Sequence, residues 1–158
     1  MMTNSKKLKV YLAGGWFNES QDKVLTFLEE ILFKRKNLEI YSPRRQAQIE
    51  PGTINKKEVR QKVFNSNLKA IEDCDVVIAS TEGKDMGTIW ECGYAYKLNK
   101  PIFYVYFTKN PLGFNLMLSE SGKGVILNEK DFKDFAKLLD WEGLDLDCSY
   151  FEYDSIIE

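Results

Sequence analysis

Two carboxylates flank the expected start of a helix in the middle of the chain. Asp85 precedes the helix predicted over 87–98, and Glu91 lies within it. We expect Glu91 in or near the first turn, where the positive end of the helix dipole favours an ionised carboxylate. An ionised glutamate beside a sugar can attack the anomeric carbon and form a glycosyl-enzyme, and Asp85 could accept a hydrogen bond from a substrate hydroxyl. The alternative is that both carboxylates only cap or solvate the helix N-terminus.

A second candidate segment is Gly14-Gly15-Trp16-Phe17, which follows a short apolar run. It lacks the G-x-G-x-x-G spacing of a dinucleotide-binding fingerprint and the Gly-Lys-Ser/Thr of a P-loop. Paired glycines let the backbone approach a ligand closely, and the two aromatic side chains offer a surface for a planar base. We therefore take Gly14, Trp16 and Phe17 as substrate-binding candidates. The alternative is a tight turn with core aromatics.

Two weaker candidates lie in segments expected to be loops. Arg44 and Arg45 could bind a phosphate, although a solvated pair of arginines is the simpler interpretation. Asn115 and Met117 fall on a predicted loop, and their residue types alone assign them no role.

Histidine is absent from the 158 residues, which excludes Ser-His-Asp and Cys-His catalysis and any metal centre with histidine ligands. The remaining candidates for nucleophile are mainly carboxylates. Cys74, Cys92 and Cys148 contain no C-x-x-C pair, so they indicate neither a zinc site nor a disulfide framework. We predict a reaction that needs no metal and no cofactor.

The composition is that of an ordinary globular domain, with 44% hydrophobic residues and a formal net charge of −2. Such a charge argues against a nucleic-acid polymer as partner. Residues 1–9 lack the apolar core of a signal peptide, and no apolar run approaches the roughly 20 residues that cross a bilayer. We expect no membrane association and a cytoplasmic location.

Strand-like and helix-like segments alternate along the chain. Apolar periodicity predicts helices over 20–35 with Ser20 as N-cap, over 56–71 with Val59, Val63, Phe64 and Leu68 buried, over 87–98 and over 131–141. β-branched and aromatic runs predict strands over 9–13, 38–41, 75–80, 101–107 and 124–127.

This alternation predicts an α/β fold: one flavodoxin-like, doubly wound domain over 1–158, with about five parallel strands and helices on both faces. Ligands bind such sheets beyond the carboxyl ends of the strands, where the strand order reverses. The segments expected to form the site are therefore 13–17, 42–48, 80–91 and 108–118.

Three stretches together resemble the nucleoside 2'-deoxyribosyltransferase family. They are 11–17 (YLAGGWF), 85–95 (DMGTIWECGYA) and 115–117 (NLM), and they occur in the family's order with similar spacing. By this resemblance, Glu91 corresponds to the family nucleophile, Asp85 to the carboxylate that binds the sugar hydroxyls, and Tyr11 to the tyrosine that orients the nucleophile.

The resemblance also implies how the base is bound and how the chain assembles. Gln46 lies where the family has a base-contacting glutamine. Asn115 and Met117 correspond to residues that a neighbouring subunit contributes, so the resemblance implies a homo-oligomer, a hexamer or a dimer, with shared active sites.

The chain departs from the family pattern at Asn67, which stands where the family often has an aspartate proposed to protonate the leaving base. An amide can hydrogen-bond a base but cannot act as a general acid. Leaving-group protonation would then fall to Asp85 or solvent, or the base preference would differ. Tyr153 could play the part of the family's terminal aromatic segment.

The resulting hypothesis is a cofactor-free double displacement that moves 2-deoxyribose from a 2'-deoxynucleoside to a free nucleobase through a covalent intermediate on Glu91. One alternative is a 2'-deoxynucleoside 5'-monophosphate N-glycosidase, in which Arg44 and Arg45 hold the phosphate, although Asp85 would repel that group. Another alternative is a noncatalytic flavodoxin-like module that binds a nucleotide.

Overall fold

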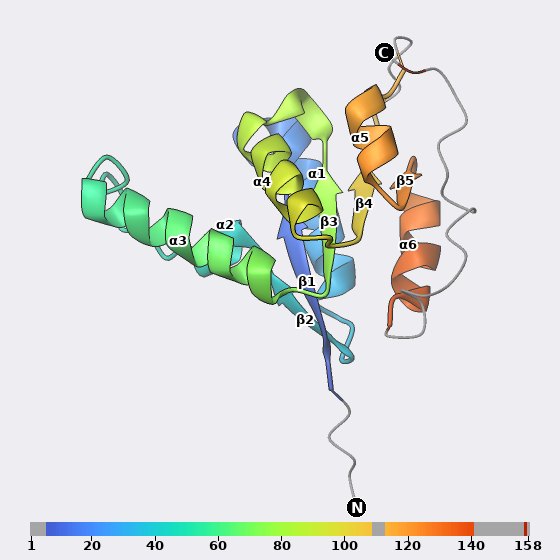
Figure 1. Ribbon diagram of the computed structural model, residues 1–158, viewed down its shortest axis with the longest axis horizontal. Helices are drawn as coiled ribbons and strands as arrows, with labels where there is room; N and C mark the ends of the chain where they lie inside the picture. The colour runs from blue at the N-terminus through green and yellow to red at the C-terminus, as the bar shows by residue number, and fades with distance from the viewer. Residues whose placement is uncertain (1–5, 109–112, 141–156, 158) are drawn as a thin grey trace, which may run out of the picture.

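The computed structural model of the chain describes residues 6–108, 113–140 and 157, and within them the fold is a parallel sheet between two layers of helices (Figure 1). The strand order is β2-β1-β3-β4-β5, so the order reverses between β1 and β3. This confirms the predicted α/β fold and puts the expected ligand site at the carboxyl ends of β1 and β3. The strands are β1 (Leu8–Ala13), β2 (Leu38–Tyr41), β3 (Val76–Ser80), β4 (Ile102–Val105) and β5 (Gly124–Ile126).

Alternate residues of each strand face opposite helical layers, because successive side chains of a strand point to opposite sides of a sheet. In β1, Leu8, Val10 and Leu12 pack with α1 and α6, whereas Tyr11 and Ala13 pack on the side of α3 and α4. The helices are α1 (Glu19–Leu32), α2 (Pro43–Gln46), α3 (Lys57–Asp73), the 3-10 turn η1 (Glu82–Lys84), α4 (Met86–Lys97), α5 (Leu116–Ser121) and α6 (Glu129–Leu138).

Two details of the helices differ from the sequence expectation. Asn18, not Ser20, caps α1, because its side-chain oxygen accepts a hydrogen bond from the backbone N–H of Gln21 at 3.0 Å. The short helices α2 and α5 occupy segments that were expected to be loops. Neither is long enough to show an apolar periodicity in the sequence.

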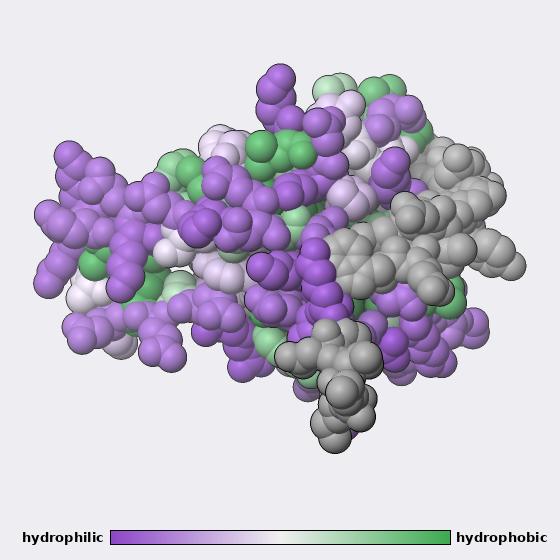
Figure 2. Space-filling model, turned by 60° about the horizontal axis from the view of Figure 1, so that its bottom comes forward, coloured by the Kyte–Doolittle hydropathy of each residue, from purple (hydrophilic) through white to green (hydrophobic). Residues whose placement is uncertain are grey.

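Helix α3 projects from the body of the molecule (Figure 1). The expectation that it buries Val59, Val63, Phe64 and Leu68 is wrong for this chain: Phe64 is 50% exposed, the other three are half-buried, and Ile71 is the buried residue of the helix. Small hydrophobic patches lie between hydrophilic side chains on the left of Figure 2, the side on which Figure 1 places the free end of α3. Only the C-terminal end of α3 is therefore held by the sheet.

None of the described helices is long and apolar enough to cross a lipid bilayer. Cys148 and Tyr153 lie outside the described residues.

Candidate active site

The central contact of the site joins β1 to α4. Tyr11 is fully buried in β1, an inner strand of the sheet, and its hydroxyl donates a hydrogen bond to Oε1 of Glu91 at 2.9 Å. Because β1 borders the strand-order reversal, this pair lies where a doubly wound sheet binds its ligands. Two residues 80 positions apart in the sequence thus form one unit.

Burial is the dominant influence on Glu91 and raises its pKa to about 7. The hydrogen bond from Tyr11 lowers this pKa, and the nearby charge of Asp85 raises it. Burial and the Glu91 charge together raise the pKa of Tyr11, so its phenol stays protonated and acts as a donor. Near neutral pH a substantial fraction of Glu91 is therefore ionised, oriented and only partly solvated, as a nucleophile requires.

Glu91 lies near the first turn of its helix but not within it. Helix α4 begins at Met86, so Glu91 lies in its second turn, beyond the first turn where the dipole acts. Asp85 caps the helix, whereas Glu91 does not. Oδ2 of Asp85 accepts hydrogen bonds from the backbone N–H and the hydroxyl of Thr88, both at 2.8 Å. Capping uses one carboxylate oxygen of Asp85 and leaves Oδ1 for another partner.

A second tyrosine extends the site from Glu91 toward α3. The rings of Tyr11 and Tyr41 stack with their centroids 5.5 Å apart, and the Tyr41 hydroxyl donates to Oδ1 of Asn67 at 3.1 Å. Burial and the charge of Glu91 raise the pKa of Tyr41. Tyr41, Gln46 and Asn67 line one pocket of about 660 Å³ between α2 and α3. The structure therefore brings Gln46 and Asn67 together beside the tyrosine pair.

The glycine–aromatic segment forms a loop packed tightly against its neighbours. A Cβ on Gly14 would lie 2.9 Å from a methyl group of Leu25, and one on Gly15 would lie 3.0 Å from Cβ of Asp85. The glycines thus bring the loop close to the core and to Asp85. Trp16 and Phe17 stack on one another at 5.0 Å and are 36% and 72% exposed, so the core-aromatic alternative is wrong.

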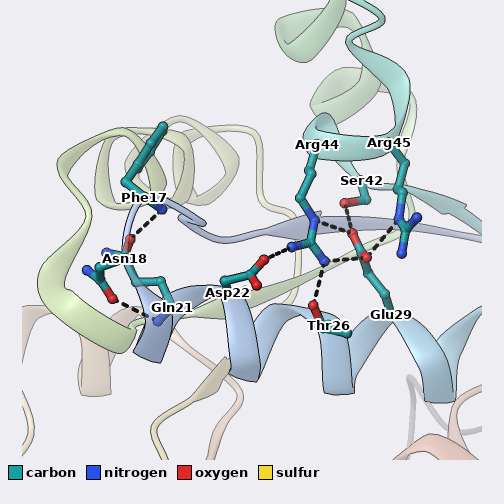
Figure 3. A network of polar contacts seen from close by, with 9 residues as sticks. All are labelled: Phe17, Asn18, Gln21, Asp22, Thr26, Glu29, Ser42, Arg44 and Arg45. Carbon is teal, nitrogen blue, oxygen red and sulfur yellow. Dashed lines mark hydrogen bonds and ion pairs between the residues drawn. The ribbon is translucent and has the colours of Figure 1, made fainter.

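A buried carboxylate holds α2 against α1 (Figure 3). Glu29 is 1% exposed, and its oxygens accept hydrogen bonds from the Ser42 hydroxyl at 2.7 Å, from Arg44 at 2.6 Å and from Arg45 at 2.8 Å. Arg44 also pairs with Asp22. These partners hold the pKa of Glu29 below its usual range against the effect of burial.

The network corrects the phosphate interpretation, because both arginines are bound to Glu29. The solvated-pair interpretation is wrong for Arg44, whose side chain is 16% exposed, and holds in part for Arg45, which is 56% exposed. Sequence reasoning missed Glu29, yet a signal was present. Glu29 falls on the apolar stripe of α1 beside Leu25, Leu28 and Leu32, where a charge requires buried partners.

Two more buried polar side chains join the loops at this edge of the sheet. Gln21 accepts from the backbone N–H of Phe17 at 3.0 Å and donates to the carbonyl of Glu82 at 3.2 Å. The carboxylate of Glu82 accepts from the backbone N–H groups of Phe107 and Thr108 at 2.7 and 2.9 Å. The loops after β1, β3 and β4 are therefore linked to one another.

Asn115 and Met117 do not join the Glu91 site within one chain. Asn115 caps α5 by accepting from the backbone N–H of Leu118 at 3.2 Å, and Met117 is 73% exposed. Both line a separate pocket of about 250 Å³ with Thr81, Ile89 and Tyr106.

Comparison with known proteins gives consistent results. Residues 10–136 match the model of a family described as nucleoside 2-deoxyribosyltransferase. A solved 2-deoxyribosyltransferase from Bacillus psychrosaccharolyticus is 30% identical, with 86% of this chain and 95% of that chain covered and a TM-score of 0.72. A search of curated proteins found no significant match.

Two more distant structures share the fold. A conserved protein from Enterococcus faecalis is 20% identical over 83% of this chain and 98% of its own, with a TM-score of 0.70. A CMP N-glycosidase from Clostridium botulinum is 19% identical over 82% of this chain and 97% of its own, with a TM-score of 0.54.

Proposed function

The chain belongs to the nucleoside 2-deoxyribosyltransferase family, and we propose that it transfers 2-deoxyribose from a 2'-deoxynucleoside to a free nucleobase. The observation that carries this proposal is the hydrogen bond from Tyr11 to Glu91 at the strand-order reversal. It supplies an oriented carboxylate whose pKa of about 7 leaves it ready to react near neutral pH.

The reaction is a double displacement. A carboxylate oxygen of Glu91 attacks C1' while the C1'–N bond breaks, and the bonding pair leaves with the base. The transition state has oxocarbenium character, which the negative charge of the half-buried carboxylate stabilises. An acceptor base then attacks C1' from the face that the first base left, and the configuration is retained.

The remaining residues divide between the sugar and the base. Asp85 binds a sugar hydroxyl through the oxygen that does not cap α4. Trp16 and Phe17 provide an exposed aromatic surface beside the Gly14 turn, and Gln46 with Asn67 lines the pocket on the other side of Tyr41.

A second copy of the chain completes the site in this proposal. Asn115 and Met117 line a pocket separate from Glu91, and Met117 is largely exposed. This exposure supports a contact of both residues with a neighbouring subunit, in a homo-oligomer with shared sites.

A 5'-monophosphate substrate is less well supported. The two arginines that would hold its phosphate are bound to Glu29, and Asp85 lies beside the reacting carboxylate. Hydrolysis remains the expected side reaction when no acceptor base is present.

The test is chromatography of the purified protein with thymidine or deoxyinosine and free adenine. The proposal predicts deoxyadenosine. Release of free base without deoxyadenosine would indicate a hydrolase. Binding of the nucleoside without cleavage would indicate a noncatalytic module.

A further inference from the structure

One end of the proposed site carries two carboxylates, whereas the other end presents an amide. Two carboxylates, Glu91 and Asp85, lie close enough for the charge of one to raise the pKa of the other. On the other side of the tyrosine stack, the group that Tyr41 contacts is the amide of Asn67. We propose that Asn67 is a specificity-determining residue that receives the departing base with its amide N–H donors. The enzyme then selects nucleosides whose base can leave as an anion. This inference rests on the proposed transferase function.

The Asn67 amide lies with its oxygen toward Tyr41. A phenol has one O–H donor, and the Tyr41 hydroxyl donates to Oδ1 of Asn67 at 3.1 Å. The carbonyl side of the amide is therefore engaged. Across the described part of the chain, the Nδ2 group has no hydrogen-bond partner, so its two N–H donors are available to a ligand in the pocket that Asn67 lines.

Neither group of this pair is a suitable proton donor. An amide donates hydrogen bonds but does not give up a proton at neutral pH. Burial and the charge of Glu91 raise the pKa of Tyr41, which makes its phenol a weaker acid than usual. A base in contact with Asn67 is stabilised by hydrogen bonds and receives no proton from this side.

The charges around the pocket favour an anion. Two lysines, Lys56 and Lys62, and one carboxylate, Glu50, line the same pocket. All three side chains are exposed, so solvent and salt screen their electric fields. Their net charge is nevertheless positive. A negative charge that develops on the departing base therefore meets N–H donors and a net positive pocket.

The bond changes balance without a general acid. The bonding pair of C1'–N goes to the base, which leaves with one negative charge, and Glu91 loses its charge as its oxygen bonds to C1'. The departed anion takes a proton from water. The acceptor base gives its N–H proton to water before it attacks, and Glu91 recovers its charge when C1' is transferred.

Such a site discriminates by the acidity of the leaving base. Electron-withdrawing substituents stabilise the anion and speed its departure. Bases that leave easily only after protonation react slowly. The substrate class is therefore 2'-deoxynucleosides of acidic, carbonyl-bearing bases.

The experiment measures single-turnover base release, with enzyme in excess, from 5-fluoro-2'-deoxyuridine, 2'-deoxyuridine and thymidine. These donors differ by one small substituent that alters leaving-group acidity. We expect release to slow in that order in the natural protein. Asn67→Asp introduces a proton donor and is expected to reduce the differences in release rate among the three donors. At the same acidic pH, the variant should release thymine from thymidine about tenfold faster than the natural protein does.

Asn65→Asp is the matched control, because Asn65 is an exposed residue of the same helix. It should keep the natural order and spread. Asn67→Ala, which removes the N–H donors without adding charge, should slow release from all three donors and widen the spread.

Equal release rates from the three donors would overturn the inference, as would an unchanged spread in both Asn67 variants. Base release from none of the donors would instead overturn the transferase function on which the inference rests.

Discussion

The chemical end and the base end of the proposed site are built from different kinds of structure. Tyr11 lies in the inner strand β1 and is fully buried, and Glu91 lies on a helix packed against the same sheet. Gln46 lies on the four-residue helix α2, and Asn67 lies on the projecting helix α3 (Figure 1). The proposed nucleophile is thus held by a residue of the core, whereas the proposed base contacts depend on peripheral elements.

The two ends also differ in what keeps them in place. Main-chain pairing of β1 with both β2 and β3 fixes Tyr11. Helix α2 is instead held by the side chain of Glu29 and its arginine partners (Figure 3). We infer that substitutions at the base end can alter specificity while the chemical end is unchanged.

The largest effect is expected from Glu91→Gln, which keeps the shape of the side chain and removes the nucleophile. Base exchange should fall about a thousandfold or more. The exposed Glu58→Gln on α3 should leave exchange unchanged. Base exchange at the natural rate in Glu91→Gln would show that Glu91 is not the nucleophile.

The next effect is expected from Glu29→Ala, which leaves Arg44 and Arg45 without their buried partner. Breaking a buried ion pair should lower the free energy of unfolding by about 3 kcal/mol. Because the native pKa of Glu29 is lowered, its contribution is complete above the ordinary carboxylate pKa and is lost as pH falls through the lowered value. The difference between variant and natural protein should therefore shrink in acid.

Urea unfolding at several pH values measures this effect. Lys69→Ala, which breaks the exposed pair of Lys69 with Asp73, is the control and should cost less than about 1 kcal/mol. In folded Glu29→Ala protein, the KM for the acceptor base should rise more than kcat falls. A loss confined to kcat would contradict the proposed role of α2.

Tyr11→Phe probes the chemical end more gently. The natural enzyme should gain activity as pH rises through about 7, because Glu91 loses its proton there. The Tyr11 hydrogen bond lowers that pKa, so its loss should move the midpoint to higher pH and reduce exchange at neutral pH about tenfold. A pH–rate profile with an unchanged or lower midpoint would contradict this electrostatic role.

The smallest effect is expected from Phe17→Ala, which removes half of the exposed aromatic pair. Loss of stacking should raise the KM for the base about fivefold and leave kcat nearly unchanged. Phe33→Ala is the matched control, since Phe33 is exposed at the opposite end of α1. An equal KM change in both variants would show that Phe17 does not contact the base.

The sequence by itself determined the parts of this protein that depend on local pattern. A continuous β-branched run predicted the strand that became Val76–Ser80, and helical periodicity predicted a helix over 20–35 where the structure has Glu19–Leu32. The doubly wound order followed from strand and helix alternation, because right-handed crossovers leave few ways to connect such units. The absence of histidine excluded histidine-dependent catalysis and favoured carboxylates as the reacting groups.

The resemblance implied that Tyr11 meets Glu91, but only the tertiary structure decided the geometry and the surroundings of such distant groups. The contact of Tyr11 with Glu91 joins residues 80 positions apart, and the pKa of Glu91 depends on burial that no local pattern specifies. The sequence placed Arg44 and Arg45 in a loop, but their partner Glu29 comes from another helix. Local periodicity is read over a few residues, whereas burial and ion pairing are set by packing between elements.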